Sequence, residues 1–168
     1  MNLAVTDACI FIDLYNLQLT DSFFKLNYEI HTSFEVMEEL YDHQKDLLKA
    51  YHSTGKLTVH EMQEEDWHYI HDMKMPKSLT PNDKTVLYLA NKNHCMVLSS
   101  DKKVRQQAKK LCCEYHGIFW ILDQLIEMQL ISKKEASLKL ELLFQKNRFY
   151  PQNREMVEEK EKRIEQWK

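Results

Sequence analysis

Short apolar runs alternate with longer amphipathic stretches along most of this chain, and this alternation constrains the fold more than any other feature. The clearest runs are residues 3–7 and 95–98, which are almost wholly apolar, as expected for strands buried on both faces of a sheet. The stretches between such runs carry apolar residues at helical spacing. Strands that alternate with helices are joined by crossovers and lie parallel. The sequence therefore predicts an α/β fold, with a mostly parallel central sheet and helices on both faces.

Three further elements are expected from local patterns. A long helix is predicted over about residues 34–51, because its apolar residues fall on one face. Residues 118–121 are apolar and are predicted as a last strand. Residues 154–168 are predicted as a charged helix with oppositely charged pairs four residues apart. This helix is thinly apolar, so it either packs along one edge or projects.

Composition excludes several classes of protein. The chain has only two glycines, Gly55 and Gly117, which excludes a Walker loop and a G-x-G-x-x-G fingerprint. The net charge of −3 disfavours a protein that coats nucleic acid by bulk charge, although local basic patches remain open. The apolar opening segment contains Asp7 and Asp13 and has no basic start, so it is not expected to be a signal peptide. With no long apolar stretch and few cysteines, we expect a cytoplasmic protein and no membrane partner.

Carboxylates stand where ligands bind in such folds. Asp7 and Asp101 each follow a predicted strand, and ligands of open parallel sheets bind beyond the carboxyl ends of the strands. Asp83 lies in the first turn of a predicted helix. Converging carboxylates repel one another unless a cation is present, and oxygen-only ligands suit Mg²⁺ or Mn²⁺. The second predicted helix adds three acids near its start, Glu35, Glu38 and Glu39.

A structural role for each aspartate is the competing interpretation. Asp83 suits a capping box with Thr80, and Asp101 and Asp7 suit the N-caps of the helices that follow them. Both roles are compatible, because one carboxylate oxygen can cap a helix while the other faces a metal.

Four segments resemble the motifs of PIN domains. V-T-D-A-C-I-F-I-D-L resembles the first strand and helix of that family, and S-F-E-V-M-E-E-L resembles its second acidic motif. S-L-T-P-N-D-K-T-V-L-Y-L-A and M-V-L-S-S-D-K-K-V-R-Q-Q-A resemble the third and fourth. The stretch G-I-F-W-I-L-D-Q-L-I-E-M-Q-L-I-S resembles a C-terminal extension of some bacterial and archaeal members. The resemblance covers residues 3–149, and the order and spacing of the motifs make it specific.

The resemblance implies a PIN-like fold and a Mg²⁺- or Mn²⁺-dependent endoribonuclease. Residues 1–150 would form the PIN-like domain with its C-terminal helical extension, and residues 151–168 a charged C-terminal helix or tail. Many bacterial members are toxins, so RNA is the expected substrate, and an antitoxin protein and a second copy of the chain are candidate partners. The implied catalytic residues are Asp7, Glu39, Asp83 and Asp101, of which Asp7, Asp83 and Asp101 would bind the metal.

Two details of the implied site remain open. Glu39 is selected because Leu40 follows it, as in the family motif, but helical phase alone does not decide between Glu39, Glu35 and Glu38. Ala8 departs from the family, in which a hydroxyl residue commonly follows the first aspartate. This departure and the low basic charge favour the alternative function, a catalytically inactive PIN-like domain that binds RNA or protein. A domain that binds a small phosphorylated ligand at the same rim is a third hypothesis.

Two other clusters of residues have a candidate function. Basic residues follow Asp101, and they form either a solvated helix face or a rim that contacts RNA phosphates; the nearest are Lys102, Lys103 and Arg105. A zinc site is a weaker alternative, because cysteines in apolar contexts usually behave as small buried hydrophobes. Its ligands would come from His94, Cys95, Cys112, Cys113 and His116.

Overall fold

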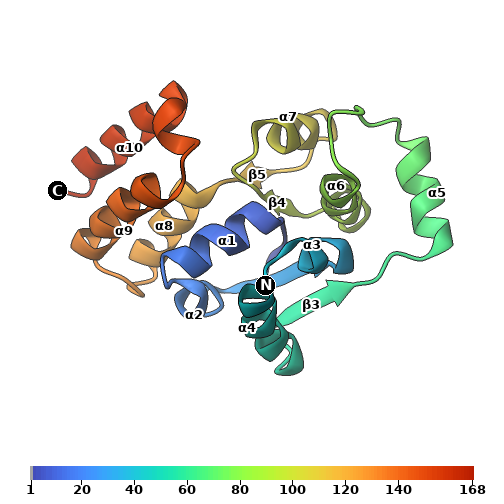
Figure 1. Ribbon diagram of the computed structural model, residues 1–168, viewed down its shortest axis with the longest axis horizontal. Helices are drawn as coiled ribbons and strands as arrows, with labels where there is room; N and C mark the ends of the chain where they lie inside the picture. Colours follow the sequence, from blue (N-terminus) through green and yellow to red (C-terminus); the bar gives the residue numbers. More distant parts are fainter. Residues whose placement is uncertain (1) are drawn as a thin grey trace. The chain divides into compact units, whose positions relative to one another are not determined.

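The computed structural model describes residues 2–168, which form two compact units (Figure 1). The first unit comprises the residues up to 12 and residues 27–117, and the second comprises residues 13–26 and 118–168. The first unit contains a five-stranded parallel sheet in the order β3-β2-β1-β4-β5. The strands are β1 (Asn2–Thr6), β2 (Tyr28–Ser33), β3 (Leu57–His60), β4 (Met96–Leu98) and β5 (Tyr115–His116).

The central strands are buried on both faces. Successive side chains of a strand point to opposite faces, yet all three residues of β4 are buried, as are the last three of β1. Both faces of the sheet are therefore covered, and the predicted α/β class with a parallel sheet is confirmed. The helices that begin in this unit are α1 (Ala8–Asn16), α3 (Phe34–Glu39), α4 (Asp42–Ser53), α5 (Glu64–Asp72), α6 (Pro81–Asn93) and α7 (Lys102–Lys110).

The helix predicted over residues 34–51 is wrong, because two helices occupy this stretch. The backbone is extended at Leu40 (φ −80°, ψ 152°) and at Tyr41 (φ −66°, ψ 154°), between α3 and α4. The side chain of Gln44 accepts a hydrogen bond from the Tyr41 N–H at 3.1 Å, which satisfies a backbone donor at the start of α4. Leu40 and Leu48 are both buried, so the apolar pattern continues across the break and hides it.

The strand predicted at residues 118–121 is also wrong. These residues open α8 (Ile118–Glu127), and the last strand is the preceding pair Tyr115–His116. Ile118, Ile121, Leu122 and Leu125 are fully buried, at the spacing of one helix face. A short apolar run fits a strand and a buried helix equally, so only the longer periodicity separates them.

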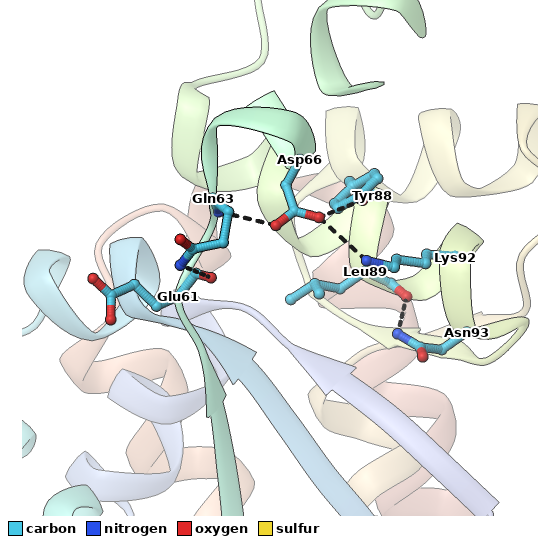
Figure 2. Close-up of polar contacts among 7 residues, drawn as sticks. All are labelled: Glu61, Gln63, Asp66, Tyr88, Leu89, Lys92 and Asn93. Atoms are coloured by element: carbon cyan, nitrogen blue, oxygen red, sulfur yellow. Dashed lines mark hydrogen bonds and ion pairs between the residues drawn. The ribbon is translucent and has the colours of Figure 1, made fainter. Parts of the chain in front are cut away.

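Helix α6 carries Asp83 at its start and is fixed at both ends. Thr80 caps it, with Thr80 Oγ1 accepting from the Asp83 N–H at 3.1 Å. Near its far end, Asp66 of α5 accepts hydrogen bonds from the Tyr88 hydroxyl at 2.6 Å and from Lys92 Nζ at 3.2 Å (Figure 2). The Tyr88 hydrogen bond is the main cause that lowers the pKa of Asp66. These contacts give α6 a defined position against the sheet, where it packs on β1, β2 and β4.

The second unit is helical and is closed by polar contacts of its last helix. Asp123 of α8 accepts hydrogen bonds from Arg163 Nε at 2.8 Å and from Trp167 Nε1 at 3.0 Å. The charged helix expected near the C-terminus therefore packs against α8 rather than projecting. No helix within residues 2–168 is long and apolar enough to cross a membrane. This unit contains the whole of α8 and the last residues of α1. Its other elements are α2 (Thr20–Phe23), α9 (Lys133–Lys146), the 3-10 turn η1 (Tyr150–Gln152) and α10 (Arg154–Gln166).

Candidate active site

Asp7 is a buried acid at the carboxyl end of β1. Its backbone N–H donates to the Leu98 carbonyl at 3.2 Å, which extends the pairing of β1 with β4. The side chain is 5% exposed. Its Oδ1 accepts from the Ile10 N–H at 3.2 Å and from Cys9 Sγ at 2.9 Å, and its Oδ2 accepts from the Ser99 hydroxyl. Asp7 therefore caps α1, as one interpretation predicted, and its second oxygen is bound by Ser99, the residue that directly follows β4.

Burial raises the pKa of Asp7 to about 7. The negative charge of Asp83 raises it further, while the hydrogen bonds from Cys9, Ser99 and Ile10 lower it. A buried carboxylate normally has a basic partner or a bound cation. Burial without a basic partner is therefore what raises the pKa of Asp7, and a bound cation would favour its ionised form.

Asp101 and Asp7 are linked through the hydroxyl of Ser99. Ser99 Oγ donates to Asp7 and accepts the Asp101 N–H at 3.0 Å. Asp101 Oδ1 accepts from the Lys103 and Val104 N–H groups at 2.8 and 3.2 Å, so this residue caps α7. Only Oδ1 is used in the cap, which leaves the Oδ2 atom of an exposed side chain for other ligands.

Asp83 and Glu39 come from two packed helices, α6 and α3. Asp83 Oδ2 accepts from the Thr80 N–H at 3.0 Å, which completes the expected capping box. Glu39 Oε2 accepts from Asn82 Nδ2 at 3.1 Å, and this contact joins the end of α3 to the start of α6.

One small pocket brings the four predicted acids together. Its volume is about 90 Å³. Neither Glu35 nor Glu38 lines it, and Glu38 instead pairs with Lys45 at 3.0 Å. Among the three acids of α3, Glu39 is thus the one at the pocket. Four of the eight described lining residues are acids and none is basic: Asp7, Ala8, Cys9, Val36, Glu39, Asn82, Asp83 and Asp101.

The donor set of this pocket fits a hard divalent cation. Carboxylate oxygens are the ligands that Mg²⁺ and Mn²⁺ prefer, and the buried charge of Asp7 has no basic partner at the pocket. Within residues 2–168, however, no three Asp, Glu, His or Cys side chains are gathered closely enough to hold an ion as they stand. Binding of a cation would therefore require Asp83 and Asp101 to turn toward Asp7 the carboxylate oxygen that is not used in a helix cap.

Sequence reasoning missed Ser99 and Asn82. Ser99 is fully buried and its hydroxyl donates a hydrogen bond to Asp7, whereas Ala8 has no hydroxyl to offer. A hydroxyl two residues before Asp101, at the end of an apolar strand, was the available signal. The contact joins residues 92 positions apart, so only the pairing of β1 with β4 reveals it.

The basic residues after Asp101 have different surroundings. Lys102 and Lys103 are exposed on the first turn of α7. Arg105 is half-buried, and its guanidinium lies 5.4 Å from the centre of the Tyr115 ring. Arg105 is therefore partly engaged with its own unit, whereas the two lysines are more exposed.

The three cysteines of the zinc alternative lie at the end of the strands opposite to the acidic pocket. Cys95, Cys112 and Cys113 line a separate cavity of about 570 Å³, together with His94 and the first residues of β1 and β4. His116 does not line it, and its Nε2 lies 2.7 Å from Glu114. In the part of the chain that the structure describes, these side chains do not form a group able to hold a metal.

Comparison with known proteins identifies the family of the chain. A solved structure of a PilT N-terminus domain protein from the hyperthermophilic archaeon Sulfolobus solfataricus P2 is similar, with a TM-score of 0.48 and 16% sequence identity, over 74% of this chain and 94% of that one. No curated protein matches the chain. A family model described as a PIN domain matches residues 3–163. The chain therefore belongs to the PIN-domain family, whose members are typically nucleases that use divalent metal ions.

Proposed function

We propose that this protein is a Mg²⁺- or Mn²⁺-dependent endoribonuclease. The observation that carries the proposal is the small pocket lined by Asp7, Glu39, Asp83 and Asp101, with no basic residue among the described residues that line it. A structural pocket of four acids without a counter-charge destabilises the fold, whereas a cation-binding pocket needs that arrangement. The family supplies the general kind of activity, and the exposed lysines of α7 supply contacts for a polyanion.

Each acid has a distinct role in this proposal. Asp7, Asp83 and Asp101 would hold the cation. In each residue, the carboxylate oxygen that accepts a backbone N–H at the start of a helix keeps the side chain in place. When bound, the cation supplies positive charge that stabilises the negative charge developing on the phosphate. Glu39 is exposed and its carboxylate accepts a hydrogen bond from Asn82; in this proposal it would accept a proton from the attacking water. Lys102 and Lys103 would position the RNA by contacts with phosphates, without reading bases.

The alternative of a catalytically inactive binding domain rests on Ala8 and on the low basic charge. Ser99, which directly follows β4, supplies a hydroxyl to Asp7, so the site has a hydroxyl although residue 8 lacks one. The alternative still makes its own prediction, RNA binding without cleavage.

Cleavage of a mixed pool of RNA should depend on added metal. We expect products with Mg²⁺ or Mn²⁺ and none with EDTA, because the pocket carboxylates repel one another without a cation. The same ions should raise the melting temperature by mass action. Gel electrophoresis of end-labelled RNA and thermal unfolding measure the two effects on one preparation. If RNA is cleaved equally in EDTA, the metal-dependent mechanism is wrong; if RNA is bound but never cleaved, the binding alternative is correct.

We further propose that the protein acts as the toxin of a toxin–antitoxin pair, as many bacterial members of the family do. Induced expression of the wild-type chain in bacteria should then arrest growth, while the Asp7→Asn variant at an equal level should not. Growth arrest by both proteins would point to an effect unrelated to RNA cleavage. Co-expression of a short neighbouring reading frame should restore growth if that frame encodes the antitoxin.

A further inference from the structure

The break between α3 and α4 places an aromatic ring beside the acidic pocket. Leu40 has an extended backbone (φ −80°, ψ 152°) and directly follows Glu39, the last residue of α3. Leu40 is buried, at 5% exposure, while Tyr41 is 72% exposed. Glu39 and Tyr41 are thus two exposed residues on either side of a buried one. Two residues span at most about 7 Å, so Tyr41 lies next to a pocket-lining acid.

The exposed Tyr41 is anchored through its backbone. Its N–H donates to the side chain of Gln44 at 3.1 Å, and Gln44 is itself buried. Its carbonyl accepts from the N–H groups of Gln44 and Lys45 at 3.0 and 2.9 Å. The ring lies nearly parallel to that of His43, with an interplanar angle of 8° and ring centres 6.0 Å apart. Two nearly parallel, exposed aromatic rings are thus presented on a fixed turn, and we call this pair of rings the platform.

This platform has little structural role of its own. A ring that is 72% exposed buries little apolar area, so it contributes little to folding. Fixed, exposed aromatic rings are the side chains on which single-stranded nucleic acids stack their bases, since every base has a π-face. A partner recognised here must therefore present a flat ring to Tyr41 while its reacting group lies at Glu39.

We propose that Tyr41 and His43 form a stacking platform for an unpaired base of the RNA, one nucleotide away from the phosphate at the acidic pocket. This inference rests on the proposed ribonuclease function and names the part of the substrate that the site would recognise. It restricts the substrate to RNA that is single-stranded at the cleaved position, because a paired base offers no free face.

The charges around the platform favour a base over a phosphate. Asp42 and Asp46 are exposed on the first turns of α4, and Glu38 lies on the preceding helix. These acids repel phosphates, whereas the exposed lysines that would attract them stand on α7. We therefore expect the platform to contribute to affinity without contributing to its dependence on salt.

The test compares the wild-type protein with Tyr41→Ala, Tyr41→Leu and Tyr41→Phe, and with Tyr69→Ala as a control. Tyr69 is also an exposed tyrosine of the first unit, at 55%, but it lies on α5 and lines no pocket described here. Binding to a fluorescent single-stranded RNA is measured in EDTA at several salt concentrations. We expect Tyr41→Ala and Tyr41→Leu to weaken binding roughly 5- to 100-fold with an unchanged salt slope. Tyr41→Phe and Tyr69→Ala should bind as the wild type does.

A scan with abasic nucleotides locates the base. In a set of RNAs that each lack one base, the wild type should lose affinity at one position near the cleavage point, and Tyr41→Ala should not lose more there. Equal binding by Tyr41→Ala and the wild type, with no such position, would overturn the platform and leave the ring as a protein contact. In that case metal-dependent cleavage can still occur, so the proposed function would stand. Loss of binding in Tyr41→Ala with no cleavage by any variant would instead support the platform and refute the nuclease. Circular dichroism of each variant excludes unfolding as the cause.

Discussion

The Asp7→Asn variant should lose RNA cleavage by about 1,000-fold or more, because it removes the charge that would hold the cation. Asn keeps the size of the side chain, and Asn is as good a helix cap as Asp. The fold should therefore persist, and the melting temperature without metal should be equal or higher. Initial rates of cleavage in Mg²⁺ and in Mn²⁺, with thermal unfolding of both proteins, measure the two effects.

Asp13→Asn is the matched control for this experiment. Asp13 lies in α1 and, like Asp7, is a buried aspartate, at 3% exposure. Burial raises its pKa as well, to about 6. It accepts a hydrogen bond from the Tyr150 hydroxyl at 2.5 Å, within the second unit. Below its melting temperature the Asp13→Asn variant should cleave RNA as the wild type does. A fully active Asp7→Asn enzyme, or equal losses in both variants, would remove Asp7 from the site.

The stability of the metal-free protein should depend on pH through Asp7. Its pKa is about 7 in the folded protein and about 3.9 in an unfolded chain. The folded state therefore holds the proton more tightly, and stability falls as pH rises from about 4 to about 7. The free energy of unfolding of Asp7→Asn, relative to the wild type, should thus increase by about 3 kcal/mol between pH 5 and pH 8.

Urea denaturation in EDTA at a series of pH values measures this difference. Asp13 has a raised pKa and contributes in the same direction, whereas the half-buried pair His31 and His60 has lowered pKa values and contributes in the opposite one. All three are present in both proteins, so their effects cancel in the comparison. Saturating Mg²⁺ should reduce the difference, because the cation stabilises the ionised form of Asp7. A difference that stays constant with pH would show that Asp7 is not protonated near neutral pH.

The sequence allowed the rim of the sheet to be predicted because strand ends are local features. Asp7 and Asp101 directly follow apolar runs, and Asp83 follows a recognisable cap, so their positions depend on few residues. Glu39 was harder to choose, since Glu35 shares its face in a continuous helix. The structure separates these acids because α3 ends at Glu39, where Asn82 binds its carboxylate.

Features that depend on distant parts of the chain were not predictable. The break at Leu40 leaves the hydrophobic period unchanged and is stabilised by the buried side chain of Gln44. The contact of Ser99 with Asp7 requires β4 to pair with β1, which no local pattern specifies. Residues 118–121 were misassigned because four apolar residues in a row carry no period of their own.

The second unit joins the beginning of the chain to its end, and this has a consequence for the order of folding. Asp13 is held by Tyr150, 137 positions later, and the Leu17 carbonyl accepts from Lys139 Nζ, 122 positions later. During synthesis residues 13–26 emerge from the ribosome before α8, α9 and η1. Their apolar side chains stay exposed to solvent until these later elements have been made. Closing so long a loop is slow. A chain truncated before residue 150 would therefore lack the partner of the buried Asp13, and we expect proteases to degrade it faster than the full chain.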